Sequence, residues 1–309
     1  MYDVIIIGAG PAGLTAGIYA SRAKLKTLII EKSMEGGQIV NTMDVENYPG
    51  INDGETGMEL AMRMTEQTKK FGAEFVTDEV TGVSLEGKEK VITCANGEYR
   101  GKTVIIGTGA KSREIGVPGE EEFKSKGISY CATCDAAFYQ DSDVYVIGGG
   151  DAAVEEALFI AKFAKNVFVV HRRDELRAAK SIQEKAFAND KIHFIWDTVT
   201  EEIIGDKVVE GIVLKNVKTG EITTHKSTTD IPSIGIFVYI GYIPQTQLYE
   251  NVLELEKGYI VTDENMKTNV EGVFAIGDTR AKAVRQVVTA VADGCIAAIQ
   301  AEKYIENLE

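Results

Sequence analysis

The sequence predicts an α/β fold with two similar units, each of which begins with a buried strand, a glycine turn and a helix. The first unit runs from the apolar residues 4–7 into Gly8-Ala9-Gly10-Pro11-Ala12-Gly13, and the second runs from residues 144–147 into Gly148-Gly149-Gly150-Asp151-Ala152-Ala153. A further apolar strand follows each helix, which is the order of a βαβ nucleotide-binding unit. We therefore expect two Rossmann-like nucleotide-binding domains of the three-layer ββα type, with the second inserted into the first.

The first domain is expected to be discontinuous in sequence. Pro118-Gly119 and the charged residues 120–126 are typical of a crossing between domains. The apolar residues 272–276 then supply a late strand that ends at Gly277-Asp278, and a helix is expected from about residue 284 to residue 304. We expect residues 1–113 and 243–309 to form one domain and residues 114–242 to form the other.

Length and charge limit the possible classes of protein. The chain has 309 residues, of which 44% are hydrophobic, and 33 Lys and Arg face 47 Asp and Glu, so that the net charge is -14. This balance argues against nucleic acid or an anionic membrane as a partner. No apolar run approaches the ~20 residues needed to span a bilayer, and the N-terminus lacks the basic segment of a signal peptide. A cytoplasmic location is the expectation.

The residue that ends the second strand differs between the two units. Glu31 stands about 20 residues after the first glycine turn, where a carboxylate receives a ribose hydroxyl. His171-Arg172-Arg173 occupies the matching place in the second unit. Guanidinium groups bind a 2′-phosphate that a carboxylate would repel, so the second unit is expected to bind NADPH and not NADH. Arg177 would join this cluster if its stretch is helical; the alternative is a solvated basic face.

Cys131 and Cys134 form a Cys-x-x-Cys pair ahead of the second glycine turn. Such a pair can hold a metal, form a structural disulfide or arise by chance. Beside two nucleotide-binding units it is best interpreted as a redox dithiol, and a position at a helix start would lower the pKa of a thiol. Cys94 and Cys295 stand in ordinary surroundings and are expected to be passive. We expect no metal site.

Taken together, these motifs resemble the low-molecular-weight bacterial thioredoxin reductases over nearly the whole chain. The ordered set is far more specific than any single motif. The motifs that carry the resemblance are Gly8-Ala9-Gly10-Pro11-Ala12-Gly13, Gly36-Gly37-Gln38, Glu46-Asn47-Tyr48-Pro49-Gly50, Cys131-Ala132-Thr133-Cys134-Asp135, Gly148-Gly149-Gly150, His171-Arg172-Arg173 and Gly277-Asp278.

The resemblance implies a homodimeric flavoprotein with FAD in the discontinuous domain and NADPH in the inserted domain. It implies that Cys134 faces the flavin, that Cys131 exchanges with thioredoxin and that Asp135 protonates a departing thiolate. The residues expected to bind FAD are Gly8, Gly10, Pro11, Ala12, Gly13, Glu31, Gly36, Gly37, Gln38, Asn47, Gly109, Gly277, Asp278, Arg285, Gln286 and Val287. The residues expected at the NADPH site are Gly148, Gly149, Gly150, Asp151, Ala152, Ala153, His171, Arg172, Arg173 and Arg177.

The chain departs from the family pattern at a few positions. Ala136-Ala137 follows the active-site Asp where the family commonly has Gly and an aromatic residue, which predicts a changed surface and retained chemistry. Ala152 stands where a Ser or Thr is frequent, so one hydroxyl contact to the pyrophosphate would be missing. Asp151 is expected to be a helix N-cap that faces away from the nucleotide.

The function that follows is the reduction of oxidised thioredoxin by NADPH, through FAD and the Cys131/Cys134 dithiol. Because the dithiol and the NADPH site share one domain and must both reach one flavin in the other, we expect the inserted domain to rotate about linkers near residues 112–116 and 241–244.

Two alternatives remain open. The first is an enzyme of the same scaffold with another electron donor or another substrate, such as a reductase fed by ferredoxin or a flavin donor, a peroxiredoxin-linked reductase or an oxidase of a small dithiol. The second is a flavin-binding redox sensor that signals through the dithiol without turnover. A sensor has no need of a complete 2′-phosphate site, so Arg172 and Arg173 favour an enzyme that consumes NADPH.

Overall fold

The computed structural model describes the chain apart from a few residues whose placement is too uncertain. These residues are Met43, Asp44, Glu46, Ser125, Cys131 and Glu309. The side chains of Asn41, Thr133 and Cys134 are likewise outside the description. None of the helices among the described residues is both long and apolar enough to cross a membrane.

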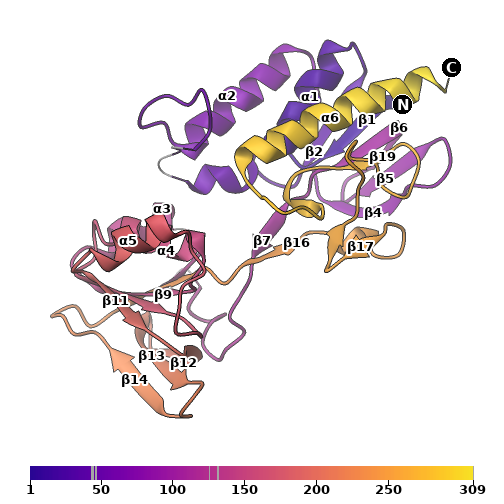
Figure 1. Ribbon diagram of the computed structural model, residues 1–309. Coiled ribbons are helices and arrows are strands. Elements are labelled where there is room, and N and C mark those ends of the chain that lie inside the picture. The colour runs from indigo at the N-terminus through magenta and orange to yellow at the C-terminus, as the bar shows by residue number, and fades with distance from the viewer. Residues whose placement is uncertain (43–44, 46, 125, 131, 309) are drawn as a thin grey trace. The chain divides into compact units, whose positions relative to one another are not determined.

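The chain divides into two compact units (Figure 1). Unit 1 comprises Met1–Lys111 and Ile243–Glu309, and unit 2 comprises Ser112–Tyr242. Two short strands, β7 (Ala110–Ser112) and β16 (Tyr242–Pro244), lie where the chain passes between the units and pair with each other. The insertion therefore begins and ends at one paired segment of the chain.

Unit 1 is built on a seven-stranded sheet in the order β3-β2-β1-β6-β5-β4, with β19 also paired to β6. The parallel strands β2, β1, β6 and β19 form its centre. Their near-continuous apolar runs suit strands that are buried on both faces. The strands of this sheet are β1 (Tyr2–Ile7), β2 (Thr27–Glu31), β3 (Glu74–Thr77), β4 (Val80–Ser84), β5 (Lys90–Cys94), β6 (Glu98–Ile106) and β19 (Val273–Ala275).

Alternate side chains of β1 enter two different cores. Val4 and Ile6 pack with three helices, whereas Ile5 and Ile7 pack with residues of β5 and of the segment 249–260. This alternation is the period-two pattern of a strand, and it makes unit 1 a layered structure. The helices are α1 (Pro11–Arg22), α2 (Gly57–Lys70) and α6 (Val287–Glu306), and the segment 249–260 contains β17 (Leu255–Glu256) and β18 (Tyr259–Ile260).

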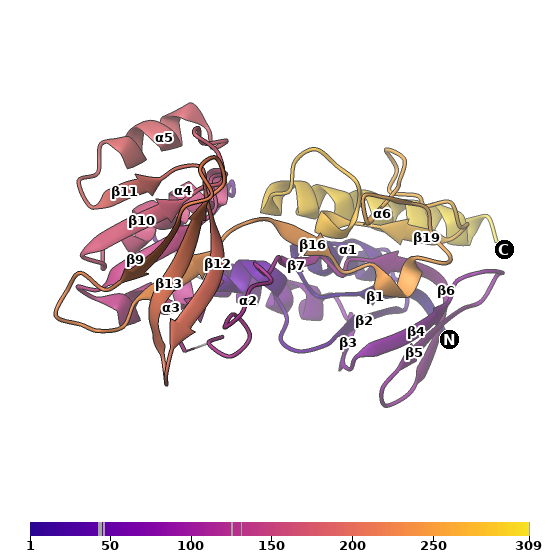
Figure 2. The same ribbon diagram turned by 90° about the horizontal axis from the view of Figure 1, so that it is seen from below.

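Unit 2 is built on a five-stranded sheet in the order β11-β10-β9-β15-β8, all of it parallel. Helices pack on one face, and the three-stranded sheet β12-β13-β14 packs on the other (Figure 2). The elements are β8 (Ile128–Ser129), α3 (Ala132–Asp135), β9 (Asp143–Ile147), α4 (Asp151–Ile160), β10 (Asn166–Val170), α5 (Lys180–Phe187), β11 (Ile192–Ile195), β12 (Thr198–Gly205), β13 (Val209–Asn216), β14 (Ile222–Lys226) and β15 (Gly235–Val238).

Short 3-10 turns join several of these elements. They are η1 (Gly37–Asn41), η2 (Ala136–Tyr139), η3 (Gln247–Tyr249) and η4 (Gly277–Thr279). The last helix begins at Val287, three residues later than expected from the sequence, because Gln286 is its N-cap and shares a capping box with Thr289.

Candidate active site

The first glycine turn connects β1 to α1. Gly8 has φ +101, and a Cβ atom there would lie 2.3 Å from the carbonyl oxygen of Gly107. A Cβ atom on Gly13 would lie 1.9 Å from the oxygen of Gly8, so neither position accepts a side chain. Gly10 is the N-cap and Pro11 the first helical residue, and the first N–H groups of α1, which have no partner within the helix, are the kind of site that binds a phosphate.

Glu31 ends β2 beside this turn. Its Oε2 accepts the N–H of Ala9 at 2.8 Å, and its Oε1 accepts the N–H of Ser33 at 3.2 Å. The carboxylate is therefore fixed against the glycine turn. A cavity of about 400 Å³ is lined by both Gly8 and Glu31, so the turn and the carboxylate face one space, as a nucleotide site requires.

Several other residues expected at the FAD site surround the same turn. Gly36 donates its N–H to the oxygen of Ala9 at 2.7 Å. Nδ2 of Asn47 donates to Oε1 of Gln286 at 3.2 Å, which joins two expected residues that lie far apart in sequence. Glu46, from the same motif, lies outside the described residues. Gly37 and Gln38 begin η1, and Gly109 has φ +66.

The Gly277-Asp278 turn is fixed by a carboxylate that the sequence analysis missed. Asp293, buried in the middle of α6, accepts the N–H of Gly277 at 3.0 Å, Nη1 of Arg280 at 3.2 Å and Nζ of Lys282 at 2.9 Å. Burial raises the pKa of the Asp278 carboxyl, although nearby cations oppose this shift. An acidic residue inside the largely apolar residues 287–299 of α6 was the available signal for Asp293.

Arg285 supplies a test of whether the residues fit a flavin. Its guanidinium lies over the ring of Tyr259, 3.9 Å from the centroid, and its Nε is buried without a hydrogen-bond partner among the described residues. A buried donor without a partner needs an acceptor. Together with Gln286 and Val287 at the start of α6, this donor fits the polar oxygens of a bound flavin.

The second glycine turn connects β9 to α4 in unit 2. A Cβ atom on Gly148, which has φ +147, would lie 2.3 Å from the oxygen of Tyr239. A Cβ atom on Gly149 would lie 2.4 Å from Nδ1 of His171. Ala153 is fully buried behind the turn. The turn thus has the same close packing as the first one.

Asp151 does not have the place expected for it. The N-cap of α4 is Gly150, and Asp151 is the first helical residue, so the N-cap interpretation was wrong. Its Oδ1 accepts the N–H of Ala179 at 2.7 Å, just before α5. The contact comes from a distant segment, and for that reason the local sequence did not indicate it. Ala152, the next residue, is exposed.

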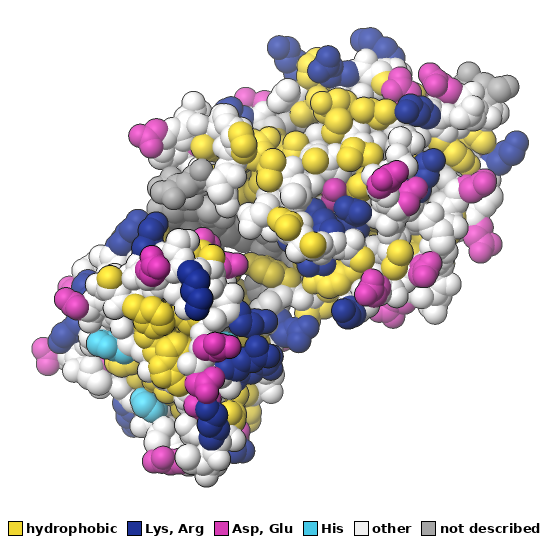
Figure 3. Space-filling model, in the orientation of Figure 1, with side chains coloured by type: hydrophobic (Ala, Val, Ile, Leu, Met, Phe, Trp, Pro, Cys, Tyr) yellow, Lys and Arg dark blue, Asp and Glu magenta, His cyan; other side chains and the backbone are white. Residues whose placement is uncertain are grey.

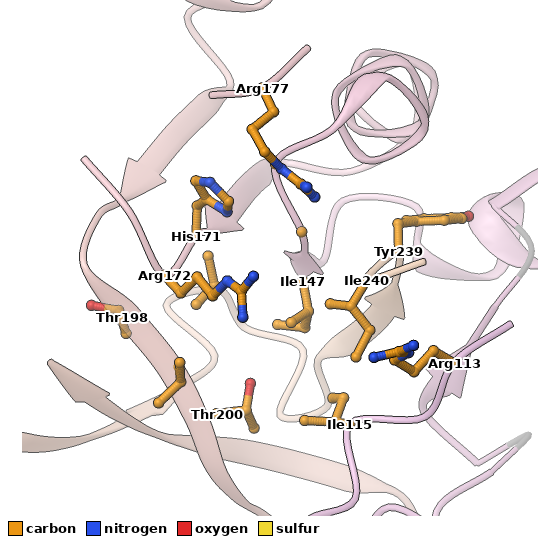
Figure 4. Close-up of a pocket in the computed structure, with 14 residues that line it drawn as sticks. Arg113, Ile115, Ile147, His171, Arg172, Arg177, Thr198, Thr200, Tyr239 and Ile240 are labelled. Carbon is orange, nitrogen blue, oxygen red and sulfur yellow. The ribbon is translucent and has the colours of Figure 1, made fainter. Parts of the chain in front are cut away.

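A cavity of about 340 Å³ lies beside this turn, and its lining includes Gly148, Gly149, His171, Arg172 and Arg177 (Figure 4). Arg177 reaches the cavity although its stretch is not helical, because its N–H donates to the oxygen of Gly149 at 2.7 Å. Arg173, which was expected in this cluster, is not among the described residues that line the cavity.

The cavity is positively charged and contains polar atoms without partners. Lys and Arg side chains gather on one side of unit 2 in the space-filling view (Figure 3). Burial and the neighbouring arginines lower the pKa of His171, which disfavours the charged form of the ring. Its Nε2 and Oγ1 of Thr200, which also lines the cavity, are buried and have no partner among the described residues. These groups fit an anionic nucleotide that offers many oxygens.

Arg113 also lines this cavity, and the sequence analysis did not select it. Its guanidinium points toward the cavity from the side opposite Arg172 (Figure 4). Arg113 lies 35 residues before the glycine turn in the linker, where no known motif marks it. Only the fold brings the two cations to one cavity.

The dithiol segment is described only in part. Cys131 lies outside the described residues, and the side chain of Cys134 is likewise not described. Helix α3 begins at Ala132 and ends at Asp135, whose side chain is partly buried. The N–H of Ala132 donates to the hydroxyl of Tyr239 at 2.7 Å. The dithiol sequence therefore spans the start of a short helix whose first amide is bound by a tyrosine.

Comparison with known proteins identifies the family. The model of the pyridine nucleotide-disulphide oxidoreductase family matches residues 2–294. The chain belongs to this family. Its resemblance to the bacterial thioredoxin reductases is also confirmed, because relatives of that name match over the full length of the chain.

Two curated relatives and one solved structure illustrate the match. A thioredoxin reductase of Peptoclostridium litorale is 59% identical over 309 residues, which cover 100% of this chain and 98% of that protein. A thioredoxin reductase of Listeria monocytogenes is 47% identical and covers 100% of this chain and 95% of its own length. The crystal structure of Lactococcus lactis thioredoxin reductase is 46% identical and has a TM-score of 0.93, with 99% and 100% of the two chains covered.

Membership of this family confirms the predicted fold class, because the related structures share both Rossmann-like domains. It also confirms that the chain is a flavin- and pyridine nucleotide-dependent oxidoreductase acting on a disulfide. The two glycine turns and the two cavities beside them are the places in this chain where such cofactors fit.

Proposed function

We propose that this protein is a thioredoxin-disulfide reductase that uses NADPH and FAD. The observation that carries the proposal is that unit 2 contains both the arginine-lined cavity and helix α3 of the dithiol. A protein that only bound a nucleotide would have no use for a dithiol in the same unit. The high identity to proteins named thioredoxin reductase supports the choice of substrate.

Each unit is assigned one cofactor. Unit 1 would hold FAD, with the pyrophosphate at the start of α1, a ribose hydroxyl on Glu31 and the flavin near Asp278 and Arg285. Unit 2 would hold NADPH, with its pyrophosphate at the start of α4 and its 2′-phosphate on Arg172 and Arg177. The carboxylate of Glu31 at the end of β2 supports FAD in unit 1, and the arginines after β10 support NADPH in unit 2.

The chain's own chemistry is thiol–disulfide exchange. The thiolate of Cys131 attacks one sulfur of the oxidised thioredoxin, which forms a mixed disulfide and releases a thiolate that takes up a proton. The thiolate of Cys134 then attacks the sulfur of Cys131, which releases the second thiol of thioredoxin and leaves a Cys131–Cys134 disulfide. Asp135 supplies a proton to a departing thiolate. When bound, FAD and NADPH supply the two electrons that return this disulfide to the dithiol.

Rotation of unit 2 about the two linkers would let the dithiol and the nucleotide reach the flavin in turn. Gly116 and Gly241 in these linkers have φ +82 and +115, and a Cβ atom on either would meet no neighbour within 4 Å. A cross-link engineered between the units should abolish thioredoxin-dependent turnover and spare one half-reaction. Undiminished turnover in the cross-linked protein would contradict the rotation.

We also propose a cytoplasmic homodimer. Unit 1 exposes apolar side chains on its helices, among them Tyr19 of α1 and Val288 and Ile299 of α6, and exposed apolar residues of this kind suit a protein interface. Light scattering of the purified protein tests the dimer.

The central experiment is anaerobic titration of the purified holoenzyme with NADPH and then with oxidised thioredoxin. We expect NADPH to bleach the flavin absorbance and thioredoxin to restore it, whereas Cys134→Ser should bleach and not be reoxidised by thioredoxin. A flavin that NADPH leaves unbleached would favour another electron donor on the same scaffold. Bleaching without reoxidation of the wild-type protein would favour another disulfide substrate or a redox sensor.

A further inference from the structure

The two neighbours of Cys131 in sequence each form a hydrogen bond to a side chain of unit 2, and each of these side chains belongs to or contacts the lining of the nucleotide cavity. Ala132, which follows Cys131, donates its N–H to the hydroxyl of Tyr239 at 2.7 Å. Tyr130, which precedes Cys131, donates its hydroxyl to Oε1 of Glu120 at 2.7 Å. Neither Tyr239 nor Glu120 belongs to a motif of the sequence, and both lie in unit 2.

The first connection runs through Tyr239. Its ring lines the nucleotide cavity (Figure 4). Its main chain is packed against the glycine turn, since its N–H donates to the oxygen of Ile147 at 2.8 Å and its own oxygen lies 2.3 Å from the position of a Cβ atom on Gly148. Any shift of the turn would therefore displace Tyr239, whose hydroxyl accepts the first amide of α3.

The second connection runs through Glu120, a buried carboxylate. Besides the hydroxyl of Tyr130, it accepts the N–H of Ile115 at 2.8 Å and the N–H of Gly116 at 2.5 Å. Ile115 lines the nucleotide cavity. Burial of a carboxylate is costly unless its oxygens are bonded, and these three hydrogen bonds place Tyr130 and the cavity-lining Ile115 on one carboxylate.

Both phenols keep their protons under all ordinary conditions. Burial raises the pKa of Tyr239, and burial together with the Glu120 carboxylate raises the pKa of Tyr130. The Tyr130 hydroxyl thus remains a donor to Glu120.

We propose that Tyr239 and Glu120 couple occupancy of the nucleotide cavity to the redox state of the Cys131/Cys134 pair. The inference rests on the proposed function, in that it requires a nucleotide in this cavity and a redox dithiol in α3. The coupling requires that conversion between dithiol and disulfide displaces Ala132 and Tyr130. Their bonded partners, Tyr239 and Glu120, lead to two residues that line the cavity, Tyr239 itself and Ile115. By linkage, a nucleotide that prefers one redox state shifts the dithiol equilibrium by the same factor.

The test uses the full-length holoenzyme and 2′-phosphoadenosine 5′-diphosphoribose, which carries the phosphates of NADPH and lacks the nicotinamide, so that it cannot exchange hydride. Its dissociation constant is measured by calorimetry for the disulfide form and for the form reduced with excess dithiothreitol. We expect the two constants to differ by about fivefold or more in the wild-type protein. In Tyr239→Phe and in Tyr130→Phe, each of which removes one hydroxyl, the ratio should fall toward one.

Two controls isolate the connection. Tyr145→Phe removes the hydroxyl of another buried tyrosine in unit 2, on β9, and should keep the wild-type ratio. Cys134→Ser cannot form the disulfide, so dithiothreitol should leave its dissociation constant unchanged; a change there would mean that the flavin, and not the dithiol, is sensed, and would overturn the inference.

Amide hydrogen exchange gives an independent measurement. Tyr239→Phe should increase exchange at Ala132 several-fold in the folded protein, while Tyr145→Phe should not. The inference would be overturned if the dissociation constants of the two redox forms were equal in the wild-type protein, or if they differed by the same factor in both phenylalanine variants as in the wild type. Either result would leave the proposed function intact. Failure of the analogue to bind either form would instead contradict the NADPH site on which the proposed function depends.

Discussion

A Cβ atom on Gly149 would lie 2.4 Å from Nδ1 of His171. The imidazole ring therefore occupies the space that a side chain at position 149 would need, and the ring in turn forms part of the cavity wall. Gly149 is therefore required by the packing of His171, which directly follows β10, as well as by the approach of a nucleotide.

Gly149→Ala should weaken nucleotide binding. The added methyl group must displace His171 or open the turn, and overpacking of this kind costs about 1–3 kcal/mol, or about tenfold or more in affinity. We expect a higher Michaelis constant for NADPH and an unchanged FAD content. Gly97→Ala is the matched control, because a Cβ atom there would meet nothing within 4 Å. An unaltered Michaelis constant in Gly149→Ala would contradict the close packing.

Arg172→Gln and Arg177→Gln should each reduce the preference for NADPH over NADH. A hydrogen bond to a charged phosphate contributes about 1.5–3 kcal/mol, so each substitution should lower kcat/KM for NADPH by roughly tenfold or more and leave that for NADH nearly unchanged. Arg173→Gln should have a smaller effect, because Arg173 does not line the described cavity. Equal effects of the three substitutions would point to a general basic surface.

Asp293→Asn should loosen the flavin site of unit 1. The buried carboxylate neutralises part of the charge of Arg280 and Lys282 and holds the N–H of Gly277. Removing one partner of a buried charged cluster costs about 3–5 kcal/mol. We expect a lower free energy of unfolding and faster release of FAD, measured by urea titration and flavin fluorescence.

The exposed pair between Arg100 and Glu98 provides the control for Asp293→Asn. Its side chains are about half exposed, so Glu98→Gln should change the free energy of unfolding by less than about 1 kcal/mol. If Asp293→Asn had an equally small effect, the buried cluster would not be holding the Gly277-Asp278 turn.

Glu156 on α4 should make stability depend on pH. Burial and the neighbouring Glu155 raise the pKa of Glu156 from its ordinary value of 4.5 to about 7. Because the folded-state pKa is the higher one, the stabilisation is fully present below the unfolded pKa and is lost as the pH rises from about 4.5 through about 7. The loss amounts to about 3 kcal/mol at alkaline pH.

Glu156→Gln removes this titration. The variant should unfold at a higher urea concentration than the wild type at about pH 8, and the advantage should vanish at about pH 5. Glu210→Gln, on the exposed side of β13, is the control and should change neither midpoint. A Glu156→Gln variant without an advantage at alkaline pH would show that the carboxylate is well solvated.

The sequence by itself determined the two glycine turns, the carboxylate after one and the arginines after the other. It also determined the position of the dithiol ahead of the second turn. These features are local, because strand, turn and helix follow one another within about 30 residues, and their spacing directly encodes backbone geometry. The family resemblance rests on the same local motifs.

Only the tertiary structure decided which polar side chains support those motifs. Asp293 of α6 accepts the N–H of Gly277, and Arg113 of the linker lines the nucleotide cavity. The hydroxyl of Tyr239 accepts the N–H of a residue that lies 107 residues earlier in the chain. Asp151, expected to be an N-cap, bonds to the start of α5 instead. Buried donors and acceptors need hydrogen-bond partners, and these residues supply them. Which residues lie close enough to do so depends on the tertiary fold and cannot be deduced from spacing in the sequence.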